Sequence, residues 1–352
     1  MHPEWQSFLE QQGAVYQEAV VQHFGTPESE SAAAMTGNIL ADCSDLGVLR
    51  FSGEDARNFL HNQLSNDVNA LQDTESRLAA YCNPKGRALA VIRLFVLDDS
   101  FYMLLPRNII EAVAKRLRMF VLMSKVVIDD LSDDFAVAGV AGPESAQLLS
   151  GYIGDLPTAP SAVVHAKGLS VIKLPQHESR YLLVGNVAGI KSAWQQLATE
   201  TQLTGQPAWQ LLDIHTGQPQ VYADTVEAFV PQMLNMHAID GVNFQKGCYP
   251  GQEIVARMYY LGKLKRRMYL AHVQQDQRPA AGDPLFASHS DSGQGAGQVV
   301  MASPAVDGGY DLLMVCPVSV IDAGPVVLGS ENGPKLKVLP LPYDVPLERK
   351  AS

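Results

Sequence analysis

The sequence lacks a long apolar run and a basic segment near its amino terminus. No apolar stretch approaches the roughly 18 consecutive apolar residues of a membrane span, and the most apolar one, residues 91–97, is interrupted by Arg93. The first lysine or arginine is Arg50, and several glutamates precede it. Secretory signals and arginine-rich presequences both need early basic residues, so we expect a cytoplasmic protein without a membrane span.

Patterns of metal-binding residues are also missing. The chain has 4 cysteines, at positions 43, 82, 248 and 316, and none belongs to a CxxC pair. None of its 9 histidines belongs to an HxxxH or HExxH pattern. We therefore expect no resident metal, because local zinc and iron–sulfur sites need several ligands in one place. A cluster would require distant cysteines to converge, or a partner to complete the ligand set.

The net charge of −11 disfavours a general nucleic-acid-binding protein. One stretch differs, because residues 254–275 contain no acidic residue. Its basic residues are Arg257, Lys263, Lys265, Arg266 and Arg267. The stretch is suited to an anionic ligand, either a carboxylated cofactor tail or a phosphate backbone. The alternative is a solvated linker that leads into a strand.

Length and composition predict two or three hydrophobic cores, since 352 residues with 47% hydrophobic content exceed one typical domain. Apolar positions from Trp5 to Phe24 predict a helix, and the Ser-, Glu- and Ala-rich residues 26–36 predict a linker, so residues 1–37 form one segment. Residues 38–262 mix strand and helix patterns and predict an α+β body of two subdomains, the inner one at about 52–132. Short β runs in residues 263–345 predict a small β-barrel.

The densest group of reactive residues is the octapeptide KGCYPGQE, Lys246 to Glu253. Gly247, Pro250 and Gly251 predict a turn, because glycine permits positive φ and proline fixes φ. The following residues Ile254, Met258 and Leu261 recur with helical spacing. The pattern therefore predicts a bend followed by a short helix that begins near residues 250–252.

Cys248 lies on this bend, just before the predicted helix, with Lys246 two residues away and Glu253 in the first helical turn. Helix N-termini and lysines favour the thiolate form of a nearby cysteine, so Cys248 is a candidate nucleophile. The alternative is a structural turn whose small cysteine is buried, as free cysteines often are.

The octapeptide, with Val255, Ala256 and Arg257 after it, closely resembles the signature of the YgfZ family. These are folate-binding proteins related to the aminomethyltransferase, or T-protein, of the glycine cleavage system. The resemblance extends roughly from Leu40 to Tyr343. Further matching segments are FSGEDARNFLHNQLSNDV at 51–68, NPKGR at 83–87, FVPQMLNMHAIDGVNFQ at 229–245 and LPLPY at 339–343.

The resemblance implies a T-protein-like fold, a multi-domain ring whose body cradles tetrahydrofolate and whose C-terminal part is the β-barrel. It implies that Trp209 lies at the folate site, where an indole can stack on an aromatic ring; the alternative role of Trp209 is core packing. A second position that is aromatic in the family is Leu46 here. The full set of implied folate contacts is Trp209, Leu46, Asn83, Arg87, Arg257 and Lys263.

One departure from the aminomethyltransferases concerns their chemistry. Those enzymes have paired aspartates shortly after a KGG-like turn, whereas this chain has Lys85, Gly86 and Arg87, followed by Ala90 and Val91. Alanine and valine cannot accept a proton or stabilise a cation. We therefore expect the folate cradle without glycine-cleavage activity.

The resemblance implies a tetrahydrofolate-binding factor that supports the assembly or repair of iron–sulfur enzymes, including radical enzymes that modify tRNA. Cys248 would act as nucleophile or transient ligand and Lys246 as its electrostatic activator, while Tyr249, Gln252 and Glu253 would orient the loop. Its partners would be iron–sulfur client enzymes or assembly proteins.

Two other hypotheses remain open. The first is a folate-dependent one-carbon transferase on an unknown substrate, in which Cys248 attacks or carries the carbon unit. The second is an RNA-binding module that contacts tRNA weakly through residues 263–267 and binds with a steep salt dependence.

Overall fold

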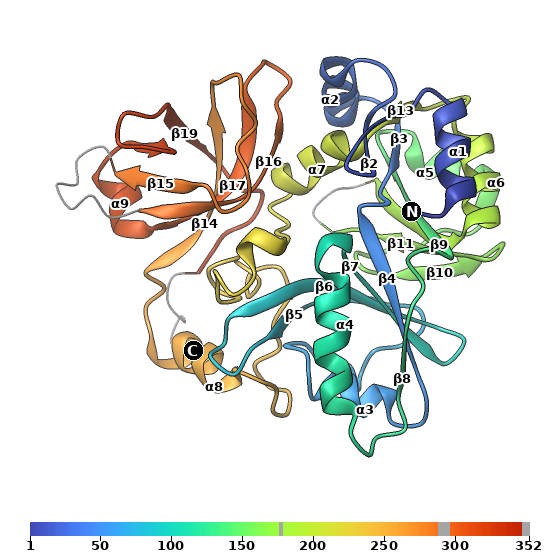
Figure 1. The fold of residues 1–352 in the computed structure, drawn as a ribbon, viewed down its shortest axis with the longest axis horizontal. Helices are drawn as coiled ribbons and strands as arrows, with labels where there is room; N and C mark the ends of the chain where they lie inside the picture. The colour runs from blue at the N-terminus through green and yellow to red at the C-terminus, as the bar shows by residue number, and fades with distance from the viewer. Residues whose placement is uncertain (176–178, 288–295, 347–352) are drawn as a thin grey trace. The chain divides into compact units, whose positions relative to one another are not determined.

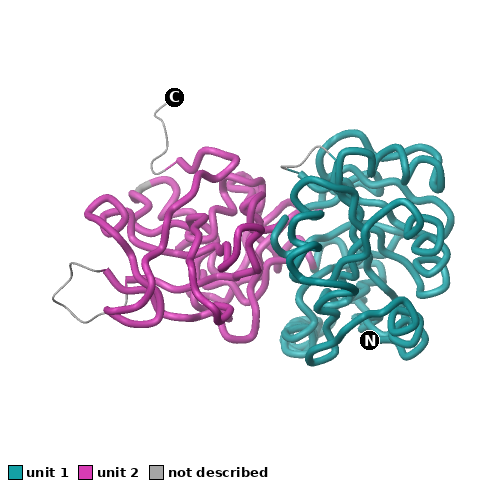
Figure 2. Tube along the Cα trace, turned by 90° about the horizontal axis from the view of Figure 1, so that it is seen from above, with its two compact units in different colours: residues 1–59, 69–77, 93–212 teal, residues 60–68, 78–92, 213–352 magenta. Residues whose placement is uncertain are grey.

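The structure is a computed structural model that describes residues 1–175, 179–287 and 296–346. The chain forms two compact units, which Figure 2 distinguishes by colour. Unit 1 comprises Met1–Phe59, Asn69–Arg77 and Arg93–Leu212, and unit 2 comprises Leu60–Val68, Leu78–Ile92 and Asp213–Ser352. Two short segments of the N-terminal half thus belong to unit 2. The domain boundaries expected from the sequence stay a prediction.

Unit 1 contains a six-stranded sheet in the order β10-β11-β12-β9-β3-β13. All neighbours pair antiparallel except β13, which lies parallel to β3. The strands are β3 (Ile39–Asp42), β9 (Phe135–Ala141), β10 (Val163–Ala166), β11 (Leu169–Lys173), β12 (Arg180–Asn186) and β13 (Gln202–Thr204).

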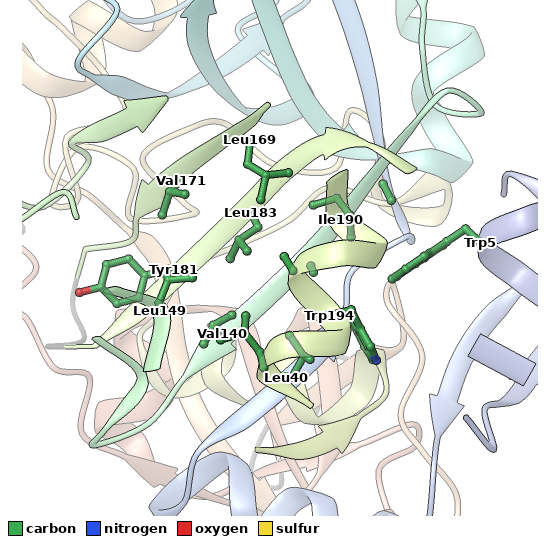
Figure 3. Close-up of a cluster of buried hydrophobic side chains, with 14 of the residues drawn as sticks. Trp5, Leu40, Val140, Leu149, Leu169, Val171, Tyr181, Leu183, Ile190 and Trp194 are labelled. Carbon is green, nitrogen blue, oxygen red and sulfur yellow. The ribbon is translucent and has the colours of Figure 1, made fainter. Parts of the chain in front are cut away.

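Helices α1 (Pro3–Gln11), α5 (Ser145–Ile153) and α6 (Val187–Leu197) contribute to one core with this sheet. The rings of Trp5 and Trp194 lie with their centroids 5.3 Å apart, and Figure 3 labels both among the buried side chains of this core, with the strand residues Leu40 and Val140. The Trp5 Nε1 donates to Asp42 Oδ1 at 2.9 Å, so its one polar atom is satisfied in the core. The N-terminal helix α1 therefore packs into the core of unit 1.

Two N-terminal predictions are wrong. The helix expected over 5–24 ends at Gln11 and is followed by the hairpin β1 (Val15–Gln17) and β2 (Val20–His23). Gly13 with φ of +92° follows the helix end, and the hairpin turn has positive φ at Glu18 and Ala19, as a two-residue primed turn requires. The expected linker is instead helix α2 (Pro27–Thr36), which starts with proline and contains alanines that favour helix.

A five-stranded sheet has the order β5-β6-β7-β4-β8, and the boundary between the units falls within β5 and β6. Strands β5 and β6 are neighbours in this sheet, and residues 83–87 connect them. The strands are β4 (Leu46–Ser52), β5 (Ser76–Cys82), β6 (Ala88–Leu97), β7 (Ser100–Pro106) and β8 (Val127–Asp130). Helices α3 (Ala56–His61) and α4 (Arg107–Val121) follow β4 and β7, respectively, along the chain (Figure 1).

Unit 2 contains the predicted C-terminal barrel, which is closed in the order β14-β17-β16-β15-β18-β19. The strands are β14 (Arg266–Val273), β15 (Pro284–Ala287), β16 (Gly297–Pro304), β17 (Tyr310–Pro317), β18 (Val326–Leu328) and β19 (Lys335–Leu339). Sequence reasoning missed β15, whose four residues include a proline and show little alternation. The remaining elements are α7 (Gln206–His215), the 3-10 helix η1 (Ala223–Thr225), α8 (Gln252–Leu261) and α9 (Val318–Ala323).

A second core of unit 2 lies outside the barrel interior. It joins residues from the ends of β5 and β6, such as Leu78 and Val91, to Phe229, Leu234 and Val255. Val255 belongs to α8, so this core supports the helix that follows the octapeptide. In the described part of the chain, no helix is both long enough and apolar enough to cross a membrane.

Candidate functional site: the loop before α8

The backbone of the loop from Lys246 to Glu253 is fixed by Gly251, which precedes α8. Gly251 has φ of +80°, a left-handed conformation that glycine adopts at little cost. A Cβ atom built on Gly251 would lie 2.5 Å from the Asn83 carbonyl oxygen and 2.5 Å from the Gly86 nitrogen. The turn between β5 and β6 therefore packs directly against the loop, and only glycine fits there.

That turn is itself fixed by Asn83 and Arg87. The Asn83 Oδ1 accepts hydrogen bonds from the Lys85 nitrogen at 2.9 Å and the Arg87 nitrogen at 3.0 Å. Its Nδ2 donates to Glu227 Oε1 at 2.9 Å, and Arg87 Nη1 donates to the Ala228 carbonyl at 2.8 Å. Both side chains thus stabilise the turn that supports the loop. Their contact with folate stays a prediction.

Lys246 is a buried cation at the base of the loop, with 9% of its surface exposed. Its Nζ donates to the carbonyl oxygens of His61 and Leu64, the latter at 2.7 Å, and lies 5.1 Å from the ring centroid of Tyr249. Burial lowers the pKa of Lys246 to about 8, against the opposing effects of Asp67 and Cys248. The amine is therefore still mainly protonated at neutral pH.

His61 and Asp67 also lie at this site, and sequence reasoning did not select them. His61 Nδ1 lies 3.2 Å from Asp67 Oδ1, and a Cβ atom built on Gly247 would lie 3.6 Å from His61 Nε2. Burial, followed by the charge of Lys246, lowers the pKa of His61. His61 is 185 residues from Lys246 in the chain, so spacing could not have linked them; the only signal was their place in a segment resembling the family.

The predicted loop residues divide into an inner and an outer group. Tyr249 is buried, and burial raises the pKa of its hydroxyl. Gln252 Nε2 donates to the Lys246 carbonyl at 3.2 Å, which closes the loop on itself. Cys248 and Glu253 are exposed, whereas the other three cysteines of the chain are buried. The alternative of a buried structural cysteine is therefore wrong for Cys248.

The predicted helix after the loop is confirmed as α8, and it contains Arg257. Arg257 is exposed, and so is Lys263 just beyond the helix end. Both residues belong to unit 2, with Asn83, Arg87 and the loop.

The other two predicted folate contacts belong to unit 1. Trp209 is 5% exposed, with the Arg180 guanidinium carbon 4.1 Å from its ring centroid. A Cβ atom on Gly139 would lie 2.4 Å from ring carbons of Trp209, so the indole is closely packed. Leu46 packs against the same hydrophobic cluster. Trp209 is thus a core residue of unit 1, and its contact with folate stays a prediction.

Chemically, the loop presents one exposed thiol close to a protonated ammonium group. An accessible thiol can attack an electrophile or bind a soft metal ion. Among the residues described, no three His, Cys, Asp or Glu side chains are grouped so that they could hold a metal ion. Transient, single-thiol chemistry therefore suits this loop better than a complete metal site.

Comparisons with known proteins agree with these observations. Residues 6–188 match the family described as the GCVT N-terminal domain. The chain is 32% identical over 278 residues to the tRNA-modifying protein YgfZ of Colwellia psychrerythraea, covering 79% of this chain and 85% of that protein.

Among solved structures, the fold is similar to the glycine cleavage system aminomethyltransferase T from Bartonella henselae. The TM-score is 0.72 at 16% identity, and the match covers 96% of each chain, which confirms the T-protein-like fold. The match to the YgfZ relative and the GCVT N-terminal domain establish that the chain belongs to the YgfZ family.

Proposed function

We propose that this protein is a tetrahydrofolate-binding factor that supports the assembly or repair of iron–sulfur enzymes, including enzymes that modify tRNA. Within it, Cys248 is the functional thiol. The observation that supports this proposal most is the exposure of Cys248 on a loop that is anchored through Lys246, Gln252 and Gly251. The relative from Colwellia psychrerythraea is named for tRNA modification, and that name supports the link to tRNA-modifying enzymes.

The loop supports transient ligand binding in three ways. Gly251 and the Asn83 turn fix its backbone, Lys246 supplies a positive charge, and the Cys248 side chain is accessible from solvent. A thiolate on a rigid loop loses little conformational freedom when it binds an incoming group. Because one thiolate cannot hold a cluster, the other ligands would come from the client or an assembly protein.

For folate, the residues of unit 2 fit the anionic glutamate tail. Arg257 and Lys263 are cationic and at least partly exposed, so they would hold its carboxylates through charge-assisted hydrogen bonds. Trp209 would contact the ring system only through the small exposed part of its indole. When bound, tetrahydrofolate supplies a carrier for one-carbon units.

Aminomethyl transfer is disfavoured by the strand that follows the Asn83 turn. Ala90 and Val91, at the positions where the aminomethyltransferases have acids, are both fully buried in β6. Val91 packs in the apolar core beneath α8, where an unpaired carboxylate would be costly. A folate-dependent one-carbon transferase would need another acid, and turnover of folate with a purified amine or thiol substrate would favour that alternative.

The test is complementation in a strain that lacks this gene, with the activity of an iron–sulfur enzyme as the readout. We expect Cys248→Ala and Cys248→Ser to lose complementation, because neither side chain provides a thiolate. Both proteins should keep the wild-type melting temperature, since Cys248 is exposed.

Gln245→Ala serves as a matched control, because Gln245 is an exposed residue just before the loop and has none of the proposed roles. We expect it to complement. Full restoration of the iron–sulfur enzyme by Cys248→Ala would refute the assignment of the thiol.

A further inference from the structure

Helix α4 ends in a group of four large apolar side chains that are exposed. Met119 and Phe120 belong to its last turn, and Leu122 and Met123 open the connection to β8 (Figure 1). Leu122 and Met123 are almost fully accessible, at 87% and 98%. These four residues are called the α4 tip. Contiguous exposed apolar groups of this kind mark interaction surfaces, whereas single exposed apolar residues do not.

The core of unit 1 does not account for the α4 tip. The residues of α4 that face the core are Ile109, Ile110, Val113, Ala114 and Leu117. At the angular spacing of a helix, Met119 falls on the opposite side of α4. Leu122 and Met123 come after the last helical residue, Val121. Folding therefore does not require these side chains to be apolar.

The backbone at Leu122 also points outside the fold. Leu122 has φ of +42°. Helices often end in a residue with positive φ, but that residue is usually glycine or asparagine, because a bulky side chain is strained there. The leucine gains no burial in return, since its side chain is exposed. Strain without a folding benefit is typical of residues whose side chains have a function.

The charge around the α4 tip is positive. Residues 112–124 contain no acidic residue, although the whole chain has a net charge of −11. Lys115 and Arg118 are exposed in this stretch. Arg118 Nη2 donates to a carbonyl of β8 at 2.9 Å, which holds the guanidinium in place while its other donors stay usable. The next cation, Lys125, is already paired with Glu54.

The spacing along α4 matches the depth profile of a bilayer surface. At about 1.5 Å per residue, Arg118 and Lys115 lie about 6 and 10 Å before Leu122 along the helix. Amphipathic elements bury their apolar side chains about 5 to 10 Å into the boundary between headgroups and acyl chains. With α4 upright and its tip inserted, both cations lie at the level of the lipid phosphates.

The shape of the α4 tip favours a bilayer over a protein. Leu122 and Met123 project from a turn, so a protein partner would need a pocket of matching shape, whereas lipid chains rearrange around an inserted side chain. A second copy of this chain, joined by two-fold symmetry at the tip, would bring two cationic surfaces together. An anionic lipid surface complements both the charge and the apolar side chains.

We propose that the α4 tip inserts reversibly into the surface of an anionic phospholipid bilayer. Leu122 and Met123 enter the acyl boundary, and Lys115 and Arg118 contact lipid phosphates. The contact is peripheral, in keeping with the lack of a membrane-spanning helix among the described residues. It uses unit 1, whereas the Cys248 loop belongs to unit 2, so it does not depend on the function proposed for that loop.

The test is sedimentation of the full-length protein with vesicles. Vesicles of phosphatidylglycerol and phosphatidylcholine in equal parts are compared with vesicles of phosphatidylcholine alone. We expect at least tenfold tighter binding to the anionic vesicles at low salt, because each of the two exposed cations contributes about fivefold near such a surface. Binding should weaken as the salt concentration rises.

The variant Leu122→Ser/Met123→Ser should weaken binding at least tenfold and keep the wild-type melting temperature, because both residues are exposed. Val15→Ser/Val306→Ser is the matched control, since it also removes two exposed apolar side chains, but outside the α4 tip. It should change binding less than twofold. Hydrogen exchange of the wild-type protein needs no variant, and anionic vesicles should protect amides within residues 119–125.

The proposal is overturned by any of three results: no binding to the anionic vesicles, equal binding by the two double variants, or binding without protection of residues 119–125. In the first case, an acidic groove on a protein partner becomes the occupant that the same charges fit. Complementation by Cys248 variants has no bearing on these results, so the two proposals fail independently.

Discussion

At the scale of single residues, Lys246 is the group that controls the electrostatics of the loop. Its ammonium group is removed from water, and two backbone carbonyls replace part of the lost hydration. A pKa of about 8 leaves it charged at neutral pH, so the loop contains a fixed positive charge. A lysine with its ordinary pKa would be charged too, but an exposed one would be screened by solvent.

The first prediction concerns the reactivity of Cys248. Lys246→Met should slow alkylation of Cys248 by iodoacetamide at pH 7.5 about five- to tenfold, since removing a nearby charge costs about 1 kcal/mol of thiolate stabilisation. Mass spectrometry of the modified peptide gives the rate. Lys265→Met, which removes an exposed lysine, should leave the rate within twofold. Equal rates in the wild type and Lys246→Met would show that Lys246 does not activate the thiol.

The second prediction concerns the pH dependence of stability. The pKa of Lys246 falls from 10.5 to about 8 on folding, so between these values the unfolded state binds more protons. Stability of the wild type relative to Lys246→Met should therefore be lowest below pH 8 and rise towards pH 10.5, by up to about 3 kcal/mol. Urea unfolding at pH 7 and pH 10 measures the difference. A stability difference that does not change with pH would contradict the buried, shifted lysine.

The third prediction compares two glycines of the loop. Gly251→Ala should destabilise the protein by about 2 to 4 kcal/mol, because its Cβ would overlap backbone atoms of the Asn83 turn and its φ is positive. Gly247→Ala should cost less than about 1 kcal/mol, since the nearest atom would lie at 3.6 Å. Thermal unfolding of both variants tests this, and similar losses would mean that the turn does not pack on the loop as described.

At the scale of elements, α8 and the start of β14 show what sequence pattern can predict. The spacing of Ile254, Met258 and Leu261 correctly predicted the helix, because local periodicity is sufficient for that inference. The same sequence gave no indication that Gln232 would bond the Val255 carbonyl, because that contact joins separate segments.

The fourth prediction tests the basic run at this junction, where Lys263, Lys265 and Arg266 are exposed. We expect weak binding of a tRNA transcript, with log K falling linearly with log salt concentration. The double variant Lys265→Gln/Arg266→Gln should reduce the slope by about 2, one unit for each lost phosphate contact. Filter binding at several salt concentrations measures it. An unchanged slope would remove this run as an RNA contact.

At the scale of the whole molecule, the order of elements was more predictable than their assembly. The small barrel in residues 263–345 was expected from its short β runs, and the structure shows it closed. The N-terminal hairpin was missed because its turn residues, Glu18 and Ala19, are not those that usually adopt positive φ. His61 and Asp67 were missed because the chain brings residues 60–68 into unit 2 from far away in sequence.

The fifth prediction follows from this interleaving. A fragment of residues 213–352 should not unfold cooperatively, because it lacks Leu78 and Val91 of its core and both carbonyl partners of Lys246. A fusion of residues 60–92 to 213–352 through a flexible linker contains every segment of unit 2, and it should restore a sharp transition. Circular dichroism during heating compares the two. A cooperative transition of the short fragment would contradict the assignment of 60–68 and 78–92 to unit 2.

The burial of three cysteines beside one exposed thiol has a practical consequence for spectroscopy. A maleimide dye or a spin label should attach to the native, unsubstituted chain at Cys248 alone. Its signal would then report on the surroundings of the loop as clients, cofactors or RNA are added. Because the backbone under the label is held by the Asn83 turn, changes in probe mobility would reflect an arriving partner rather than motion of the loop.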